Sequence, residues 1–363
     1  LCPTRAMTPV RFGHVAEPLG RPDPMTRVLV VGAGPTGLTA ALTLARLGIA
    51  VDVRERQPKI GSLSLAATFH PPTLQILHDL GIDLQEHGRV ADVLEYRRGQ
   101  QRIQLELREL SDETPFPYRR HVPQAQVCEL LLAELARTDT DVRFGVEALP
   151  PAHGYDLVVA ADGAGSQWRS HAGAPFNVQP YSGQVARLIC DDDFDDFAPV
   201  TYLFTDDDSV SLLRMADHAR VILRIGDEPP DQSELIMRAQ EALGRPVTVR
   251  TWSTYRARRA VLDLPKVGSM VVLGDAAHLT NTRGGMNMNA GIHDAAVVCR
   301  AFASGDLPAA VAERHRVWTH MLLPRTHATL GANRFDHVAN IAADTTARRE
   351  FLRQGSMLDM VTL

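Results

Sequence analysis

Apolar runs that end in glycine alternate with helix-forming segments in the first part of the chain. The run VLVVGAG, which begins at Val28, is short and continuously apolar, as expected of a buried strand. Residues 36–47 carry apolar positions at helical spacing and are followed by Gly48, a common helix stop. Residues 50–54 form a second apolar strand. The pattern predicts a strand–helix–strand unit within about 30 residues.

The pattern changes character farther along the chain. Residues 181–224 alternate between apolar and polar positions in short runs separated by acidic turns, which is typical of an antiparallel sheet with one exposed face. The buried-strand pattern then returns at residues 270–273. The other predicted elements are helices over 71–80, 125–136, 234–243 and 290–303, strands over 90–96, 102–107, 142–146, 155–161 and 247–255, and further helices up to residue 358.

These elements predict an α/β fold in which a Rossmann-like nucleotide-binding domain is interrupted by a mostly antiparallel β-sheet substrate domain and followed by C-terminal helices. The two domains are expected to share a cleft. The predicted boundaries are a disordered leader at 1–24, the nucleotide domain at 25–87, 118–175 and 264–305, the substrate domain at 88–117 and 176–263, and a helical segment at 306–363.

Composition narrows the class of protein. The 363 residues are 45% hydrophobic and 22% charged, which is ordinary for a globular enzyme. A net charge of −5 provides no basic field for nucleic acid, and no run of about 18 apolar residues suggests a membrane span. The four cysteines are scattered without metal-ligand spacing, so we expect reduced thiols, no metal site and a cytoplasmic location.

A glycine-rich motif lies between the first predicted strand and helix. Residues 32–37 read GAGPTG and fit the pattern G-x-G-x-x-G. Gly32 would permit a tight turn, Gly34 would let a pyrophosphate approach the backbone, and Gly37 would let the helix pack on the strand. Glu55 follows at the end of the second strand, where a carboxylate can accept both hydroxyls of a ribose. The motif therefore predicts FAD or NAD at this position rather than NADP.

Two further motifs end apolar strands. They are Asp162-Gly163 in DLVVAADGAG and Gly274-Asp275 in VVLGDAAH, and each alone is an ordinary turn. In the order G-x-G-x-x-G, Asp-Gly, Gly-Asp, the three motifs make the chain resemble the class A flavoprotein aromatic hydroxylases, which have the p-hydroxybenzoate hydroxylase fold. The resemblance runs from about residue 25 to the end and includes ATFHPPTLQILHDLGI, residues 67–82.

This resemblance implies an FAD-dependent monooxygenase. NADH or NADPH would reduce the flavin, O2 would form a flavin C4a-hydroperoxide, and an aromatic or other electron-rich small molecule would be hydroxylated. The flavin does the chemistry, so no protein side chain is assigned as a catalytic acid or base. Two alternatives remain: a flavin-dependent reductase of the same fold, and a non-catalytic flavin-fold binding protein. The substrate, the choice between NADH and NADPH, and the oligomeric state stay open.

The resemblance also implies residue roles. Gly284 and Gly285 would pass over the isoalloxazine ring, and a helix beginning near Asn289 would direct the N–H groups of Met288 and Asn289 at the flavin, with Asn289 as its cap. The full implied cofactor set is Gly32, Gly34, Pro35, Thr36, Gly37, Glu55, Arg56, Gln124, Asp162, Gly163, Gly274, Asp275, Gly285, Met288 and Asn289. The assignment requires Glu55 and Asp275 to lie on the same side of the molecule.

Three positions depart from the family pattern. The segment 280–283 lacks the usual proline, which predicts a more mobile loop. Asn287 replaces a glycine, although asparagine tolerates positive φ. Leu65 replaces an arginine near the cofactor phosphates.

Other candidates carry two interpretations. Tyr202, Phe204, Ser211 and Thr282 are candidate substrate residues, and for the first three packing in the sheet core is the alternative. We expect His278 and His293 to be packed, hydrogen-bonded histidines. Residues 256–259 contain three arginines that are either solvent-exposed or in contact with the nicotinamide cofactor.

Overall fold

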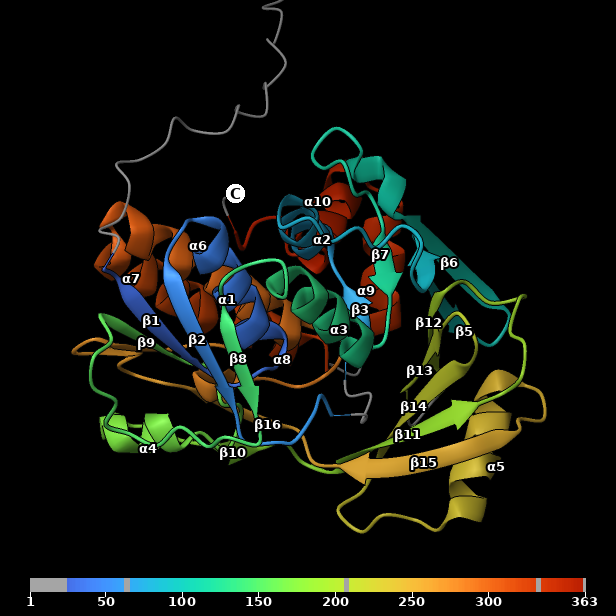
Figure 1. Ribbon diagram of the computed structural model, residues 1–363. Coiled ribbons are helices and arrows are strands. Elements are labelled where there is room, and N and C mark those ends of the chain that lie inside the picture. Colours follow the sequence, from blue (N-terminus) through green and yellow to red (C-terminus); the bar gives the residue numbers. More distant parts are fainter. Residues whose placement is uncertain (1–24, 62–65, 206–208, 331–333, 362–363) are drawn as a thin grey trace, which may run out of the picture.

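The computed structural model describes residues 25–61, 66–205, 209–330 and 334–361 (Figure 1). The predicted leader and Leu65 lie outside the described residues. Within the described ranges, no helix combines the length and apolar character needed to cross a membrane.

A six-stranded sheet forms the nucleotide-binding half. Its order is β17 (Lys266–Val267), β18 (Met270–Val272), β9 (Leu157–Ala160), β1 (Arg27–Val31), β2 (Ala50–Glu55) and β8 (Asp141–Phe144). All neighbours are parallel except β17 and β18. The strands are apolar on both sides because both faces are covered: Val28 and Val30 enter one core cluster, while Leu29 and Val31 enter another.

Helices fill both cores. Apolar residues of α1 (Pro35–Arg46), α2 (Pro71–Asp79), α3 (Gln124–Leu135) and α6 (Met286–Ser304) join the cluster of Val28, together with residues of α7 (Leu307–Val317). The cluster of Leu29 includes Trp168 of α4 (Gln167–Ala172) and Trp318 of the π-helix η3 (Trp318–Leu322), which leads into α8 (Leu323–Ala328).

A second, seven-stranded sheet forms the other half (Figure 1). Its order is β15 (Val249–Tyr255), β11 (Gln184–Cys190), β14 (Ala219–Ile225), β13 (Ser209–Arg214), β12 (Val200–Phe204), β5 (Val93–Arg98) and β6 (Gln101–Glu106). Only the β12–β5 pair is parallel. One face packs on α5 (Gln232–Leu243), through buried residues such as Leu188, Val221 and Leu235. Side chains alternate between faces, so the residues between these positions point the other way.

Short elements connect the two halves. One small sheet consists of β3 (Thr68–Phe69), β7 (Arg119–His121) and β4 (Arg89–Ala91), and another of β10 (Gln179–Pro180), β16 (Arg258–Val261) and β19 (His278–Leu279). The described residues also include the 3₁₀ helices η1 (Leu107–Leu110) and η2 (Gly274–Ala276).

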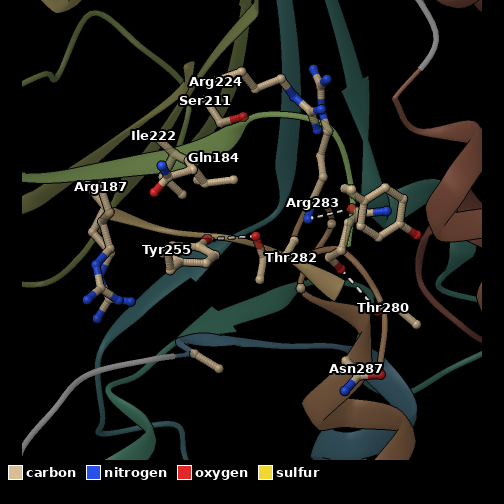
Figure 2. A pocket seen from close by; sticks show the side chains of 18 of the residues that line it. Gln184, Arg187, Ser211, Ile222, Arg224, Tyr255, Thr280, Thr282, Arg283 and Asn287 are labelled. Carbon is tan, nitrogen blue, oxygen red and sulfur yellow. Dashed lines mark hydrogen bonds between the residues drawn. The ribbon is translucent and has the colours of Figure 1, made fainter. Parts of the chain in front are cut away.

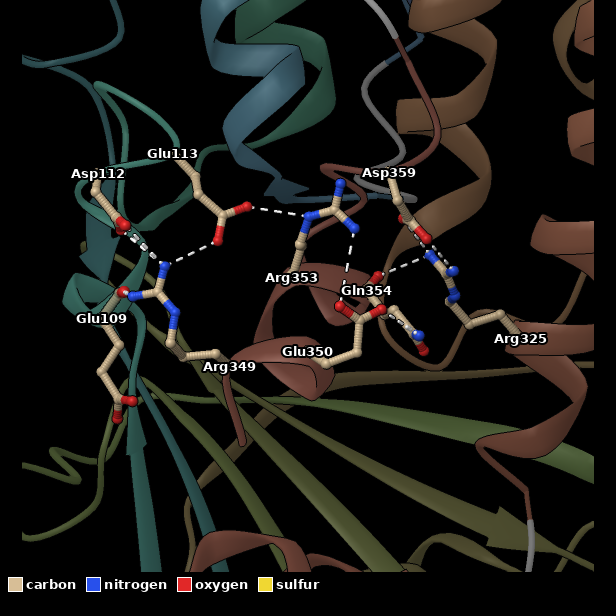
Figure 3. Close-up of polar contacts among 9 residues, drawn as sticks. All are labelled: Glu109, Asp112, Glu113, Arg325, Arg349, Glu350, Arg353, Gln354 and Asp359. Atoms are coloured by element: carbon tan, nitrogen blue, oxygen red, sulfur yellow. Dashed lines mark hydrogen bonds and ion pairs between the residues drawn. The ribbon is translucent and has the colours of Figure 1, made fainter. Parts of the chain in front are cut away.

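The C-terminal helices pack on the β5–β6 hairpin. Phe335 of α9 (Arg334–Ala342) and Leu352 of α10 (Thr345–Gly355) share a buried cluster with Tyr96. Figure 3 shows ion pairs that join α10 to the segment after η1, such as Arg349 to Asp112 at 2.9 Å. The C-terminal segment thus supports the edge of the second sheet.

The predicted fold class is confirmed, and most predicted elements agree within two residues. Two predictions were wrong. The strand predicted over 90–96 is two strands, β4 and β5, which are separated at Asp92 and belong to different sheets. The helix expected to begin near Asn289 begins at Met286, because Gly285 adopts φ 65° as its N-cap and turns the chain into the helix three residues earlier. The proposed domain boundaries stay a prediction.

Candidate active site

The three sequence motifs meet at one edge of the parallel sheet. Val31 pairs with Arg54 of β2 and with Ala160 of β9, and Ala160 pairs with Val272 of β18, so the carboxyl ends of four strands are in line. The residues at or just after these ends are the glycine loop, Glu55, Asp162 and Asp275. Ligands of open parallel sheets bind outside this edge. The requirement that Glu55 and Asp275 lie on the same side is therefore met.

The glycine loop has the shape that a dinucleotide pyrophosphate needs. A Cβ on Gly37 would stand 2.0 Å from the carbonyl oxygen of Gly32, so only glycine lets α1 approach the loop this closely. A Cβ on Gly34 would meet nothing within 4 Å, and Gly34 faces the large cavity described below. The N-terminus of α1, with Pro35 in its first turn, points at this space. The residues present fit a bound FAD phosphate group.

Glu55 is tied to the same loop. Its Oε2 accepts a hydrogen bond from the backbone N–H of Ala33 at 2.8 Å, and its Oε1 accepts one from Gln57. The carboxylate therefore helps to hold the loop in shape and stands at the end of β2. Arg56 beside it is exposed.

The two aspartates differ in their surroundings. Asp162 accepts hydrogen bonds from the backbone N–H groups of Gln167 and Trp168, so it orders the first turn of α4, and its Oδ1 is buried without a partner. Asp275 faces the cavity. Desolvation by the surrounding protein raises the pKa of the Asp275 carboxyl, while His278 and Asn287 partly offset this effect.

The loop before α6 closes over this edge without a proline. Asn281 is buried and anchors the loop: its Nδ2 donates to Thr326 O at 2.6 Å, and its Oδ1 accepts from the N–H of Arg283. The next residues, Gly284 and Gly285, border the cavity. The asparagine thus supplies a local constraint in the segment where the resemblance leads us to expect a proline.

Asn289 has a different role from the predicted cap. It is fully buried, and its side chain accepts from the N–H of His70 at 3.0 Å and donates to the carbonyl oxygens of Thr68 and Gly285. It therefore joins the first turn of α6 to β3 behind the loop. Met288 of the same turn does border the cavity.

A chain of hydrogen-bonded polar groups leads from Asp275 into the protein interior. Asn287 Nδ2 donates to Asp275 at 2.8 Å, and Asn287 Oδ1 lies 2.9 Å from His278 Nδ1. The other ring nitrogen of His278 lies 2.7 Å from Asp294, which also accepts hydrogen bonds from Arg314 and Trp318. His293 is also buried and lies 2.9 Å from Thr73 Oγ1, which confirms that both histidines are packed and hydrogen-bonded.

A cavity of about 1560 Å³ extends from the motif edge to the second sheet. It exceeds the ~300–1,000 Å³ of a typical small-molecule site, so it has room for a dinucleotide and a second molecule. The predicted residues on its wall are Gly34, Pro35, Thr36, Gln124, Gly163, Asp275, Gly284, Gly285, Met288, Tyr202, Ser211 and Thr282. The predicted residues that do not line the cavity are Gly32, Gly37, Glu55, Arg56, Asp162, Gly274, Asn289 and Phe204.

Phe204 packs in the sheet core. Its ring centroid lies 6.0 Å from that of Phe335 and 6.4 Å from that of Tyr96. Thr282, in contrast, stands at the cavity with its hydroxyl 2.7 Å from that of Tyr255 (Figure 2).

Arginines on the cavity wall were missed by the sequence prediction. Arg187, Arg220 and Arg224 of the second sheet line the cavity, as do Arg119 of β7 and Arg283 of the loop before α6. Figure 2 labels Arg187, Arg224 and Arg283 of this set. In ARVILRI, residues 219–225, two arginines lie four positions apart among apolar residues, so they share one face of a strand. This pattern could have indicated that one face of the strand carries arginines and is covered by another part of the molecule.

Comparisons with known proteins agree with this geometry. The FAD binding domain family matches residues 25–156 and 154–317, which is more than half of the chain. This chain belongs to the FAD binding domain family. Its relatives include a 6-methylpretetramide 4-monooxygenase of Streptomyces rimosus, 28% identical over 301 residues, which are 74% of this chain and 54% of that protein.

Two other comparisons define the extent of the likeness. A flavin-dependent monooxygenase of Mycobacteroides abscessus is 28% identical over 312 residues, which are 74% of this chain and 65% of that protein. The chain therefore spans 54% and 65% of the length of these two curated relatives. The crystal structure of p-nitrophenol 4-monooxygenase PnpA from Pseudomonas putida DLL-E4 superposes with a TM-score of 0.80 at 21% identity, covering 91% of this chain and 99% of that one. It shows the same fold.

Proposed function

We propose that this protein is an FAD-dependent monooxygenase that uses NADH or NADPH and O2 to hydroxylate a small aromatic or other electron-rich molecule. The observation that carries the proposal is one continuous cavity with the glycine loop and Asp275 at one end and the polar face of the second sheet at the other. The names of the similar proteins, which include a p-nitrophenol 4-monooxygenase, support an aromatic substrate.

The residues at the motif edge would hold FAD. The loop at Gly34 and the N-terminus of α1 would bind the pyrophosphate, Glu55 the adenosine ribose, and Asp275 the ribityl hydroxyls. The chemistry that bound FAD supplies is acceptance of a hydride from the nicotinamide and activation of O2. The turn at Gly285 and Met288 would direct the N-terminal end of α6 at the ring, where partial positive charge stabilises an anion.

The rest of the cavity wall would bind and shield the substrate. Tyr202 and Ser211, paired across β12 and β13, would contact it from the second sheet, and Thr282 from the loop. Enclosure by the two sheets would exclude water from the reaction and hold the substrate ring in one orientation. No protein nucleophile is required. The reduced thiols and the predicted cytoplasmic location are compatible with this chemistry and stay predictions.

The test is to purify the protein with added FAD and measure NADH and NADPH oxidation over a panel of phenols and heteroaromatics, with product and peroxide both quantified. Hydroxylated product from at least one compound is expected. Peroxide alone across the panel would contradict hydroxylation, and reduction of an added compound instead would identify the reductase alternative.

A matched pair of variants tests the site itself. Asp275→Asn should weaken FAD binding at least about tenfold, because the amide keeps the shape but loses the negative charge and one acceptor. Asp263→Asn removes an exposed carboxylate before β17 and should bind FAD as the wild type does. Failure of wild-type protein to bind FAD would overturn the whole proposal.

A further inference from the structure

The substrate half of the cavity is rich in positive charge. A row of paired residues crosses the second sheet from Tyr202 through Ser211 and Ile222 to Arg187. Arg220 and Arg224 lie two positions on either side of Ile222 on β14, so they share its face. All of these residues line the cavity. This face is turned toward the cofactor end, away from α5.

Two more guanidinium groups complete the wall near Tyr202. Arg283 lies over the Tyr202 ring, with its guanidinium carbon 5.4 Å from the ring centroid, and its Nη1 donates to Ser209 Oγ at 3.0 Å. Arg119 is 4% exposed and donates from Nη2 to the carbonyl oxygen of Gly355 at 2.8 Å. Both groups lie within electrostatic reach of Tyr202.

These two arginines hold unused donors. Arg283 Nε and Nη2 and Arg119 Nε are buried without a hydrogen-bond partner. Within the described ranges, no carboxylate forms an ion pair with either residue. Desolvation by burial lowers the pKa of Arg283 to about 10 and also lowers the pKa of Arg119. A guanidinium group keeps its positive charge in proteins at neutral pH.

Buried, unpaired guanidinium groups are costly, and their planar donor sets match a carboxylate. A cavity that keeps two of them beside a tyrosine is suited to a ligand that brings the missing negative charge. The acidic residues on the cavity wall, Glu234, Glu241 and Asp275, are not ion-paired with either one. These donors make a candidate anion subsite in the part of the cavity next to the second sheet.

We propose that the substrate is an aromatic carboxylate, and that Arg283 and Arg119 bind its carboxylate group beside Tyr202. That the ligand is a substrate rests on the proposed function, whereas binding of an anion at this subsite does not require catalysis. Arg283 comes from the loop that borders the cofactor end, so it would fix the distance between the carboxylate and the reacting ring.

The test compares acids with their neutral amides by calorimetry on FAD-supplemented protein. Benzoate, 2-naphthoate and anthraquinone-2-carboxylate are each paired with the corresponding carboxamide, so that ring size is sampled. At least one acid should bind about tenfold or more tightly than its amide. If no acid is preferred over its amide in the wild type, the proposal is wrong.

Variants show which arginines cause the preference for acids over amides. Arg283→Gln should reduce the acid-to-amide ratio to about threefold or less and leave amide binding unchanged. Arg300→Gln removes the same charge from a partly exposed position on α6 that does not line the cavity, and it should keep the ratio. Arg119→Gln should lower the acid-to-amide ratio as Arg283→Gln does. If Arg119→Gln does not fold, the ratio in Arg283→Gln alone tests the proposal. A preserved ratio in Arg283→Gln contradicts the proposal.

Two outcomes separate this inference from the proposed function. Protein that binds FAD and oxidises NADPH without preferring acids retains the proposed function and loses the anion subsite. Protein that prefers acids but never binds FAD retains the subsite and loses the proposed function. If Arg283→Gln raises the KM for NADPH but not for NADH and leaves the acid preference intact, these donors serve the 2′-phosphate of NADPH, and the proposal is overturned.

Discussion

Gly34 and Gly37 of the loop between β1 and α1 offer two single-methyl substitutions with opposite expected effects. An added Cβ at Gly37 would stand 2.0 Å from Gly32 O and 3.0 Å from its carbonyl carbon, which are backbone atoms. An added Cβ at Gly34 would meet nothing within 4 Å. The Gly34 backbone, at φ −77° and ψ 178°, is open to any L-residue.

The magnitudes follow from these distances. Gly37→Ala gains about 1 kcal/mol of helix propensity, because residue 37 is inside α1. Overpacking typically costs about 1–3 kcal/mol and occasionally more, and a 2.0 Å approach to backbone belongs at the upper end. We expect a net loss of about 2 kcal/mol in the free energy of unfolding. Gly34→Ala should change that free energy by no more than ~0.5 kcal/mol.

Cofactor binding should follow the opposite order. The methyl of Gly34→Ala would project into the space assigned to the FAD pyrophosphate, so FAD should bind at least about tenfold more weakly, a loss of about 1.4 kcal/mol. The assay is urea unfolding of the apoprotein by circular dichroism, followed by titration with FAD and detection by flavin fluorescence. If Gly34→Ala binds FAD like the wild type, the loop is not the pyrophosphate site. If Gly37→Ala is as stable as the wild type, the packing argument is wrong.

Three other predictions concern the polar groups. Against the raising effect of burial, Arg314 and His278 lower the pKa of Asp294 to about 2, below its ordinary value of 3.8. Its stabilisation is therefore present above about pH 4 and is lost as the pH falls toward 2. Asp294→Asn should lower the free energy of unfolding, measured in urea at pH 7, by about 3–5 kcal/mol, because Arg314 keeps a buried charge without its partner. If the difference in this free energy between wild type and variant stays constant from about pH 4 to about pH 2, the prediction is wrong. Asn287→Ala removes a hydrogen bond that partly offsets the effect of burial on the pKa of Asp275, so that pKa should rise further. On acidification, FAD affinity should then begin to fall at a higher pH than in the wild type. If fluorescence titration shows the same dependence of FAD affinity on pH in both proteins, the pKa of Asp275 does not control FAD binding. Arg349→Ala should lower Tm only slightly, and most of the difference should vanish near ~1 M salt, because its ion pairs are partly solvent-exposed.

Local features of the sequence predicted much of the parallel sheet and its motif edge. The run from Val28, the helix after Pro35 and the strand ending at Glu55 follow from apolar spacing and glycine positions within a short stretch. The predicted end points of these elements were nearly correct. Their convergence with Asp275 was also expected, because parallel strands of one sheet present their carboxyl ends at the same edge.

Errors appeared where long-range contacts outweigh local pattern. The predicted strand over 90–96 divides because β4 pairs with β7 while β5 pairs with β12 and β6. Asn289 looked like a cap from its place after a loop, but its side chain satisfies backbone groups of Thr68 and His70 more than 200 positions earlier. Nothing near residue 289 in the sequence indicates those partners.

The sequence by itself determined the class of sheet, the nucleotide loop and the order of the strand-ending carboxylates, because these depend on backbone conformation and spacing within a few residues. Only the tertiary structure decided what faces the cavity. Whether Arg187, Arg224 or Arg283 meets solvent or an enclosed space depends on strand register and on which face of the second sheet is turned toward the first. That choice is made by packing between segments far apart in the chain, such as α5 against one face, and the alternating pattern of a single strand does not contain it.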